Sequence, residues 1–205
     1  MDFLTLITII GGVILTIGYI PQLFKLHKTG DTHGINNGFW YLVTTTVAIT
    51  AVNLIVDSAP LVLIIIQVIN AALAGIVLIT VHFYRKEYKQ MVYPTFLIVA
   101  IILLAGVVLP IEITQTVASI SIVVAYVSQL ITLFKAPSVS GVAPSLYLLI
   151  AVGLGIMATK MFVTDVTPYI IATELINIAL LLTCACVSFY FQWKGAKTDE
   201  RRARV

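Results

Sequence analysis

The side chains best suited to chemistry in this sequence are a few polar residues inside long apolar stretches. Lys160 is a basic residue and Glu174 an acidic residue in such stretches, and Asn70 and Asn177 are carboxamides in others. An ionisable group in hydrocarbon indicates a functional site by default, and a carboxamide there needs hydrogen-bonding partners. These residues can hold a small polar solute or exchange a proton.

No pattern typical of an enzyme accompanies them. The sequence shows no nucleotide-binding loop, no cluster with metal-ligand spacing and no nucleophile with its base. We therefore expect a protein that is not an enzyme, takes no cofactor or metal and uses no ATP. The net charge of +3 is better explained by loops beside a membrane than by a nucleic-acid partner.

The elements that position these residues are predicted to be membrane-spanning helices. Of the 205 residues, 60% are hydrophobic and only 10% charged, and the mean hydropathy is +1.07. A soluble domain has about a quarter charged residues, and apolar runs of about twenty residues cross a bilayer as helix. We predict an all-α polytopic membrane protein with seven spans, at residues 3–24, 36–56, 60–83, 94–110, 114–134, 143–163 and 168–191.

The basic residues predict the orientation of these spans. Eleven of the twelve Lys and Arg residues fall in the loops after the first, third and fifth spans and in the tail, whereas the opposite loops and the amino end hold only acids. The positive-inside rule places the amino terminus outside and the carboxy terminus in the cytoplasm. The compact loops favour a prokaryotic plasma (cell) membrane, with membrane lipids as partners.

The chain repeats itself with an offset of 107 residues. Residues 19–28 recur as 126–135 with five of ten positions identical, and three further pairs match: Gly34 and Gly141, Gln67 and Glu174, and Asn70 and Asn177. Duplicated helical units are typical of transporters. We predict two parallel three-helix repeats, residues 1–84 and 113–193, joined by residues 85–112 with an inversion linker helix and followed by a basic tail, 194–205. This 3+1+3 arrangement places a cavity between the repeats.

A Pro-Gln pair, Pro21 and Gln22, stands at the inner end of the first span and is followed by a basic loop and Gly34. Together with its repeat mate Ser128-Gln129 and the seven-span plan, this pair resembles the PQ-loop superfamily, and within it the SWEET and SemiSWEET sugar transporters. The resemblance covers residues 3–193 and implies a central cavity that opens alternately to the two sides of the membrane.

Pro21 lacks a backbone donor and crowds the preceding turn, so it loosens the first span. We expect Gln22 to donate to nearby carbonyls that this change frees. The resemblance implies that this region is a gating hinge, with Gln129 as the second copy and Pro144 as a further gating proline. Ser128 replaces the proline in the second copy, so the two halves are expected to move unequally.

Two pairs of aromatic repeat mates lie near this hinge. Tyr19 and Tyr126 flank it, and they are expected to form an inner gate or to pack structurally. Trp40 and Tyr147 lie just inside the membrane, where aromatic belts occur, and they are predicted to anchor the chain at the interface, with a role in the pocket as the alternative.

Asn70 and Asn177 occupy equivalent positions in the third and seventh spans. They resemble the substrate-binding asparagines of SWEET transporters, one in each repeat. We predict that they form a binding pocket together with Asn53, Gln67 and the charged residues Lys160 and Glu174. The alternative is that the asparagines join neighbouring helices by hydrogen bonds.

Lys160 and Glu174 are predicted to lie at matching depth in antiparallel helices, because each helical residue advances 1.5 Å. Three roles are open. They can form a static ion pair, they can bind a zwitterion or an anionic head group, or Glu174 can exchange a proton. Their equivalents in the first repeat are neutral, Asn53 and Gln67.

The leading functional expectation is a carrier that moves a small polar solute by alternating access. A sugar is favoured, and a proton-coupled amino-acid or zwitterion carrier is the first alternative. A receptor that binds a peptide or small ligand without transport is the second. The solute, lipids, a proton and a second copy of the chain are the expected partners.

Overall fold

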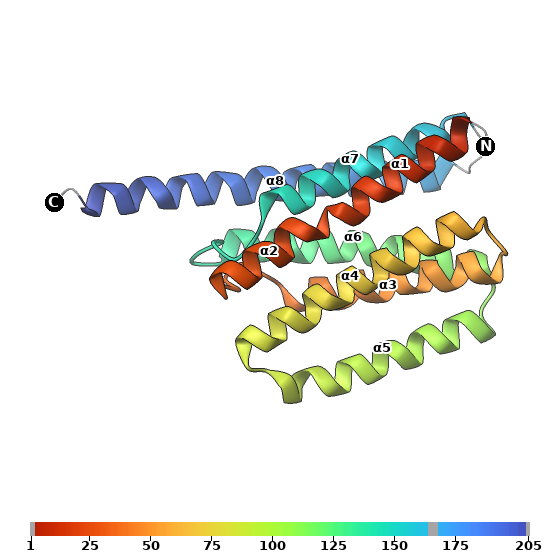
Figure 1. Cartoon of the computed structure of the whole chain (residues 1–205), viewed down its shortest axis with the longest axis horizontal. Helices are drawn as coiled ribbons and strands as arrows, with labels where there is room; N and C mark the ends of the chain where they lie inside the picture. The colour runs from red at the N-terminus through yellow and green to blue at the C-terminus, as the bar shows by residue number, and fades with distance from the viewer. Residues whose placement is uncertain (1–2, 164–167, 204–205) are drawn as a thin grey trace.

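The computed structural model describes residues 3–163 and 168–203, with side chains placed except at 88, 90, 93, 97, 103, 105–107, 168–170 and 197–203. Within these ranges the fold is all-helical, without strands, as predicted (Figure 1). The helices are α1 (Phe3–Ile17), α2 (Tyr19–Thr29), α3 (Asn37–Val56), α4 (Leu61–Arg85), α5 (Tyr88–Val108), α6 (Ile111–Lys135), α7 (Pro144–Met161) and α8 (Pro168–Ala203).

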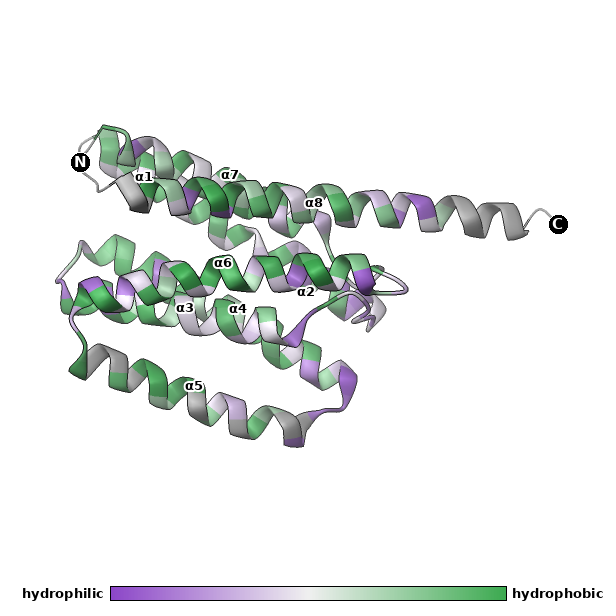
Figure 2. Ribbon diagram, turned by 180° about the vertical axis from the view of Figure 1, so that it is seen from behind, coloured by the Kyte–Doolittle hydropathy of each residue, from purple (hydrophilic) through white to green (hydrophobic). Residues whose placement is uncertain are grey.

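Most of these helices are long and apolar enough to cross a membrane. Six stretches in the described part of the chain meet that requirement, the first of which combines α1 and α2 as Phe3–Thr29. Large apolar side chains such as Phe3, Phe24, Phe96 and Phe134 are exposed on the outside of the bundle, and the ribbon in Figure 2 has the colour of hydrophobic residues along much of the helices. Such a surface is stable in lipid and not in water, which indicates a multi-pass membrane protein.

The helix ends differ from the predicted spans mainly in the linker region and at the carboxy end. The helix predicted at 94–110 is α5, which begins at Tyr88 and contains Pro94 in its interior. The last span was predicted to end at 191, but α8 continues to Ala203 and projects beyond the bundle (Figure 1). The side chains of the predicted basic tail lie outside the described residues from position 197 onward, as do Asp2 and Asp165.

Pro21 breaks the first span, as its chemistry predicts. The ring of a proline crowds the carbonyl four residues earlier and cannot donate to it, and that carbonyl belongs to Ile17, the last residue of α1. Gly18 separates α1 from α2. A side chain at Gly18 would lie 2.9 Å from Ile150, so α7 packs closely against the break.

The packing joins the first helix of each sequence repeat to the second helix of the other. α1 packs on α7 and α6 packs on α3, while α3 packs on α4 and α7 on α8. α5 contacts α3, α4 and α6 and lies at the edge of the bundle (Figure 1). The turn at residues 57–60 and the start of α6 lie at the same end as the amino terminus, which we call the acidic end. Loops 30–36 and 137–143 lie at the opposite, basic end.

Candidate functional site

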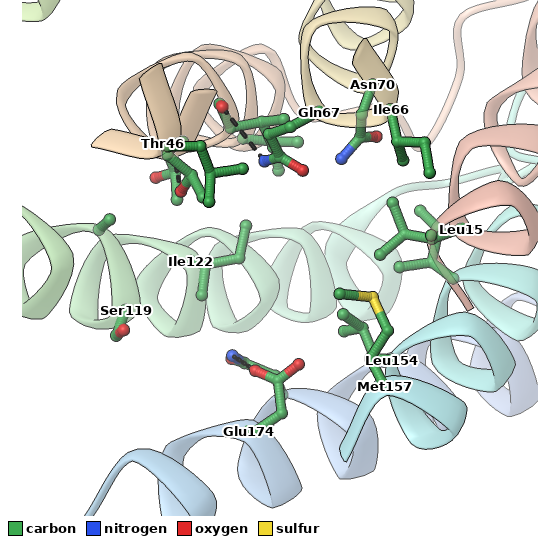
Figure 3. A pocket seen from close by; sticks show the side chains of 18 of the residues that line it. Leu15, Thr46, Ile66, Gln67, Asn70, Ser119, Ile122, Leu154, Met157 and Glu174 are labelled. Carbon is green, nitrogen blue, oxygen red and sulfur yellow. Dashed lines mark hydrogen bonds between the residues drawn. The ribbon is translucent and has the colours of Figure 1, made fainter. Parts of the chain in front are cut away.

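A cavity of about 300 Å³ lies inside the bundle (Figure 3). This volume is at the lower limit of the usual range for ligand pockets. Its walls run from Tyr19 and Tyr126 toward the acidic end, where Leu54, Leu63 and Met161 line it.

The cavity lies between equivalent positions of the two sequence repeats. Of the 24 described residues that line it, 20 form ten pairs that are 107 positions apart. The pairs are Thr8 and Gln115, Gly12 and Ser119, Leu15 and Ile122, Tyr19 and Tyr126, Val43 and Ile150, Val47 and Leu154, Thr50 and Met157, Leu54 and Met161, Gln67 and Glu174, and Asn70 and Asn177. The two walls are therefore alike in position although their chemistry differs.

Asn70 and Asn177 both line this cavity, and each is 4% exposed. The Asn177 Nδ2 donates to Glu174 Oε2 at 3.4 Å. The Oδ1 atoms of both asparagines have no hydrogen-bond partner. These two oxygen atoms therefore do not join neighbouring helices, which was the alternative role of the asparagines. An acceptor that is buried without a partner costs free energy, and a solute in the cavity can supply the missing donor.

Gln67 and Glu174 face the cavity from opposite sides (Figure 3). Gln67 Nε2 donates to the Val47 carbonyl at 3.3 Å, which holds the amide against α3. Glu174 lies one turn from Asn177 on α8, on the same helical face. The structure thus brings Asn70, Asn177, Gln67 and Glu174 together around one space.

Asn53 and Lys160 do not line the cavity, in contrast to the sequence-based prediction. The Asn53 Oδ1 accepts a hydrogen bond from the Thr114 hydroxyl at 3.0 Å. Asn53 therefore connects α3 to α6 at the acidic end. Lys160 lies in the last turn of α7.

Of the three roles left open for Lys160 and Glu174, the static ion pair between them is not found among the described side chains. Among the described side chains, the ion pair recorded is that of His33 with Asp31, and the Glu174 carboxylate accepts from Asn177. Glu174 lines the cavity and Lys160 does not, although their depths were expected to match.

An aromatic layer separates the cavity from the basic end. Phe39 is at its centre, with ring centroids 5.0 Å from Trp40, 5.7 Å from Tyr126 and 6.3 Å from Tyr147. Tyr19 contacts Trp40 at 6.1 Å. Trp40 and Tyr147 are each 2% exposed, so the prediction that they anchor the chain in a membrane-interface belt is wrong. They pack in the interior.

Beyond this layer, Gln22 binds the loop of the other repeat. Its Nε2 donates to the Gly141 carbonyl at 2.9 Å, and its Oε1 accepts from the Ala143 N–H at 2.8 Å. The prediction that Gln22 serves nearby carbonyls of its own span is therefore wrong. Those partners are about 120 residues away in the sequence, and Gln22 is 1% exposed.

Gln129, in the second repeat, makes the two equivalent bonds to the loop of the first repeat. Its Nε2 donates to the Gly34 carbonyl at 2.8 Å, and its Oε1 accepts from the Asn36 N–H at 3.0 Å. Each partner is 107 positions before the corresponding partner of Gln22. Each glutamine thus binds the loop of the other repeat, so the Gln present in both repeats has the same structural role in each.

Arg85 and Gln192 form a second equivalent pair. The Arg85 guanidinium donates to the Thr32 and Ile35 carbonyls at 3.1 and 2.7 Å. Gln192, 107 positions later, donates through Nε2 to the two equivalent carbonyls of loop 137–143, at 3.0 and 2.6 Å. We call loops 30–36 and 137–143 with Gln22, Gln129, Arg85 and Gln192 the interloop network.

The repeated glycines allow the two loops to approach. A Cβ atom at Gly141 would lie 2.5 Å from the Asp31 carbonyl oxygen, and one at Gly34 would lie 2.9 Å from the Val139 Cα. Gly34 also has a φ of +80°, which disfavours other residues. Both contacts are with backbone atoms, so a rotamer change in a neighbouring side chain cannot make room for a Cβ atom at either glycine.

Asp31 joins the two loops at the surface. One carboxylate oxygen accepts from the backbone N–H and the ring Nδ1 of His33 at 2.9 and 2.6 Å, and the other accepts from the Ser140 hydroxyl. Burial by itself would raise the pKa of Asp31, but the hydrogen bonds from Ser140 and His33 outweigh it and hold the pKa below its usual value.

The remaining predicted hinge residue, Pro144, is the first residue of α7. Proline is well tolerated there because the first N–H of a helix has no intrahelical acceptor. Asn37, its repeat mate, likewise begins α3, after Asn36 accepts a capping bond from the Phe39 N–H at 3.1 Å.

Several cavity residues were missed by the sequence analysis, although a signal for them exists. The lining residues of α1 and its neighbour α2 have the spacing of one helical face, with steps of four, three and four. The same spacing recurs in α6. The missed residues are Thr8, Gly12 and Leu15 in the first copy and Gln115, Ser119 and Ile122 in the second, and Tyr19 and Tyr126, which were expected at an inner gate, continue the two faces.

The chain matches no protein-family model, no curated protein and no solved structure. The site is therefore interpreted from its own geometry.

Proposed function

We propose that this protein is a membrane carrier that moves a small polar solute by alternating access, without ATP. The observation that supports this proposal best is the place of the cavity between ten pairs of equivalent positions. A cavity shared in this way can be opened at either end by movement of one half against the other, as in other carriers built from repeats.

In this proposal, α1–α4 and α6–α8 are two parallel three-helix repeats, and α5 is the linker that restores their common orientation. The reciprocal packing of α1 on α7 and of α6 on α3 supports the arrangement. So does the exchange of hydrogen bonds by Gln22 and Gln129. The resemblance to PQ-loop proteins predicts the same plan.

The interloop network and the aromatic layer are the closed gate of this carrier. A hydrogen bond contributes only about 0.5–1.5 kcal/mol net, because water replaces it when it breaks. A gate of such bonds can therefore open when solute binding and closure of the other end offset its loss. The break at Gly18 lets α2, which carries Gln22, move separately from α1.

The charge distribution predicts which side of the membrane this gate faces. The basic residues of loops and helix ends predict that the basic end faces the cytoplasm. The structure then corresponds to a state with the cytoplasmic gate closed and the cavity directed outward. The resemblance of the asparagine pair and the helix plan to SWEET transporters makes a sugar the first candidate.

The proposal is tested by reconstituting the purified full-length chain in liposomes without ATP. Counterflow of labelled sugars, amino acids and amines should exceed that of empty liposomes for at least one solute. Asn177→Ala should lower this flux about tenfold or more, because it removes two polar atoms from the wall. Gly155→Ala is the matched control, since a Cβ there meets no atom within 4 Å.

Two outcomes contradict the proposal. One is flux equal to that of empty liposomes for every solute, and binding under the same conditions would then favour a receptor. The other is unchanged flux in Asn177→Ala at normal expression, which would reject this cavity as the route.

A further inference from the structure

We propose that the transported solute carries a protonated amino group, and that Glu174 holds this group in the cavity. This inference rests on the proposed carrier function and specifies the substrate class. It depends on the charge of the cavity, on its unpartnered acceptors and on the difference between its two walls.

The cavity has a single charged wall residue among the described residues, and it is the acid Glu174. No described Lys, Arg or His side chain is recorded in an ion pair with it. A carboxylate removed from water is costly unless an opposite charge or several donors compensate it. Its one recorded side-chain donor is the Asn177 amide, at 3.4 Å, which is a long contact. A cation in the cavity would supply the rest.

The acceptors around Glu174 match the donors of an ammonium group. Asn177 directs its Nδ2 toward Glu174, which leaves its Oδ1 without a partner, and the Asn70 Oδ1 is also unpartnered. An ammonium group has three donors and no acceptor. The Glu174 carboxylate and the Asn177 Oδ1 come from the same helix and can accept from two of these donors, and the Asn70 Oδ1 lines the other wall of the cavity. A hydroxyl in place of the ammonium group has one donor and no charge to pair with the carboxylate.

The wall opposite Glu174 carries no charge at the equivalent position. The equivalent residue is Gln67, which is neutral and already donates to the Val47 carbonyl. Beside Glu174, α7 presents Leu154 and Met157 to the cavity, whereas Thr50 is the equivalent of Met157 (Figure 3). A solute with an amino group at one end and a small apolar part beside it fits this wall.

A proton is the competing cation. If Glu174 is neutralised by a proton, the solute itself can be neutral, and a proton gradient drives its movement. The two possibilities differ in a measurable way, because only an amine requires the carboxylate for its own binding.

Matched pairs of solutes provide the test. Glucosamine differs from glucose, and serinol from glycerol, by an ammonium group in place of a hydroxyl. Thermal shifts of the full-length protein at slightly acidic pH give an apparent affinity for each of the four. We expect each amine to bind about tenfold or more tightly than its neutral partner, and the same preference in liposome counterflow.

Two variants test whether Glu174 causes the preference for amines. Glu174→Gln should abolish it, with a loss of about tenfold or more in amine affinity, and should fold because the equivalent position naturally carries Gln. Its melting temperature without solute checks the fold. Glu174→Asp keeps the charge and should retain most of the preference.

The outcomes separate this inference from the carrier proposal. Amine binding that depends on Glu174, without flux of any solute, would support the amine site and contradict the carrier. Neutral-sugar flux driven by a proton gradient, without amine preference, would support the carrier and overturn the amine inference. No stabilisation by either amine, or an unchanged preference in Glu174→Gln, would also overturn it.

Discussion

The interloop network and the cavity use the duplicated positions differently. In the network, equivalent positions hold the same residue or make the same bonds: Gln22 and Gln129 are identical, and Arg85 and Gln192 donate to equivalent carbonyls. In the cavity, Asn70 and Asn177 are identical, but several other equivalent positions differ in chemistry, as in the pair of Gln67 and Glu174.

The difference follows from what each region must contact. The network binds backbone carbonyls and N–H groups, which are the same in both halves whatever the side chains are. In the proposed carrier, the cavity walls face a solute, and a solute without two-fold symmetry needs unlike groups on the two sides. The proposed gate can therefore stay symmetric while the proposed binding site does not.

The largest loss of stability is expected when Gln22 or Gln129 of the interloop network is replaced. Gln22→Ala and Gln129→Ala each leave a buried carbonyl and a buried N–H without their partner, which costs roughly 2–4 kcal/mol. Thermal unfolding in detergent should show similar losses for both. Ile20→Ala, on the same helix at a side chain that is 52% exposed, should melt close to the wild type. Unequal losses would break the two-fold comparison.

The next effect is expected from the close approach of the loops. Gly141→Ala places a methyl group against the Asp31 backbone, 2.5 Å from its carbonyl oxygen, and should cost about 1–3 kcal/mol through forced backbone shifts. Gly34→Ala should cost a comparable amount, with strain from its positive φ in addition. Melting temperatures measure both. Gly155→Ala should be neutral or slightly stabilising, since alanine favours helix.

An exchange of wall residues sharpens the comparison within the cavity. The double variant Gln67→Glu with Glu174→Gln moves the carboxylate to the other wall. If the walls are equivalent in position, amine preference should return relative to Glu174→Gln alone, although less than fully because the bond to Val47 is lost. The same matched solute pairs measure it. A preference that stays absent would show that the apolar surface of α7 is also needed.

The smallest effect is expected from Asp31 at the surface of the network. Its pKa in the folded protein is below its usual value of 3.8, so its bonds stabilise the fold above that value and are lost as the pH falls through the folded pKa. Unfolding followed between pH 5 and 3 (roughly the range around a carboxyl pKa) should show stability falling. Asp31→Asn should show a weaker dependence, and an equal dependence in both would exclude Asp31 as the cause.

The helices were predictable because their causes are local. A backbone in hydrocarbon must satisfy its own hydrogen bonds, so apolar runs of sufficient length give helices wherever they occur. Pro21 determines a break four residues earlier for the same local reason. The start of α5 was missed by six residues because residues 88–93 are polar enough to be assigned to a loop, and yet they continue the helix.

The site was predictable in part. The offset of 107 residues identified Asn70, Asn177, Gln67 and Glu174 as a related group, and all of them line the cavity. It also related Asn53 to Lys160, which do not. Asn53 instead accepts a hydrogen bond from Thr114 on the neighbouring helix, and a small rotation of a helix is enough to turn a side chain from a cavity to a neighbouring helix.

By itself, the sequence determined that the chain forms long apolar helices and that residues 107 apart are equivalent, since composition and repetition are properties of the chain alone. Only the tertiary structure decided the partners. Gln22 reaches Gly141 across 119 residues, and Trp40 is in the interior rather than at an interface. The physical reason is that a hydrogen bond or a ring contact depends on how whole helices are rotated and packed against each other, and no local pattern fixes that rotation.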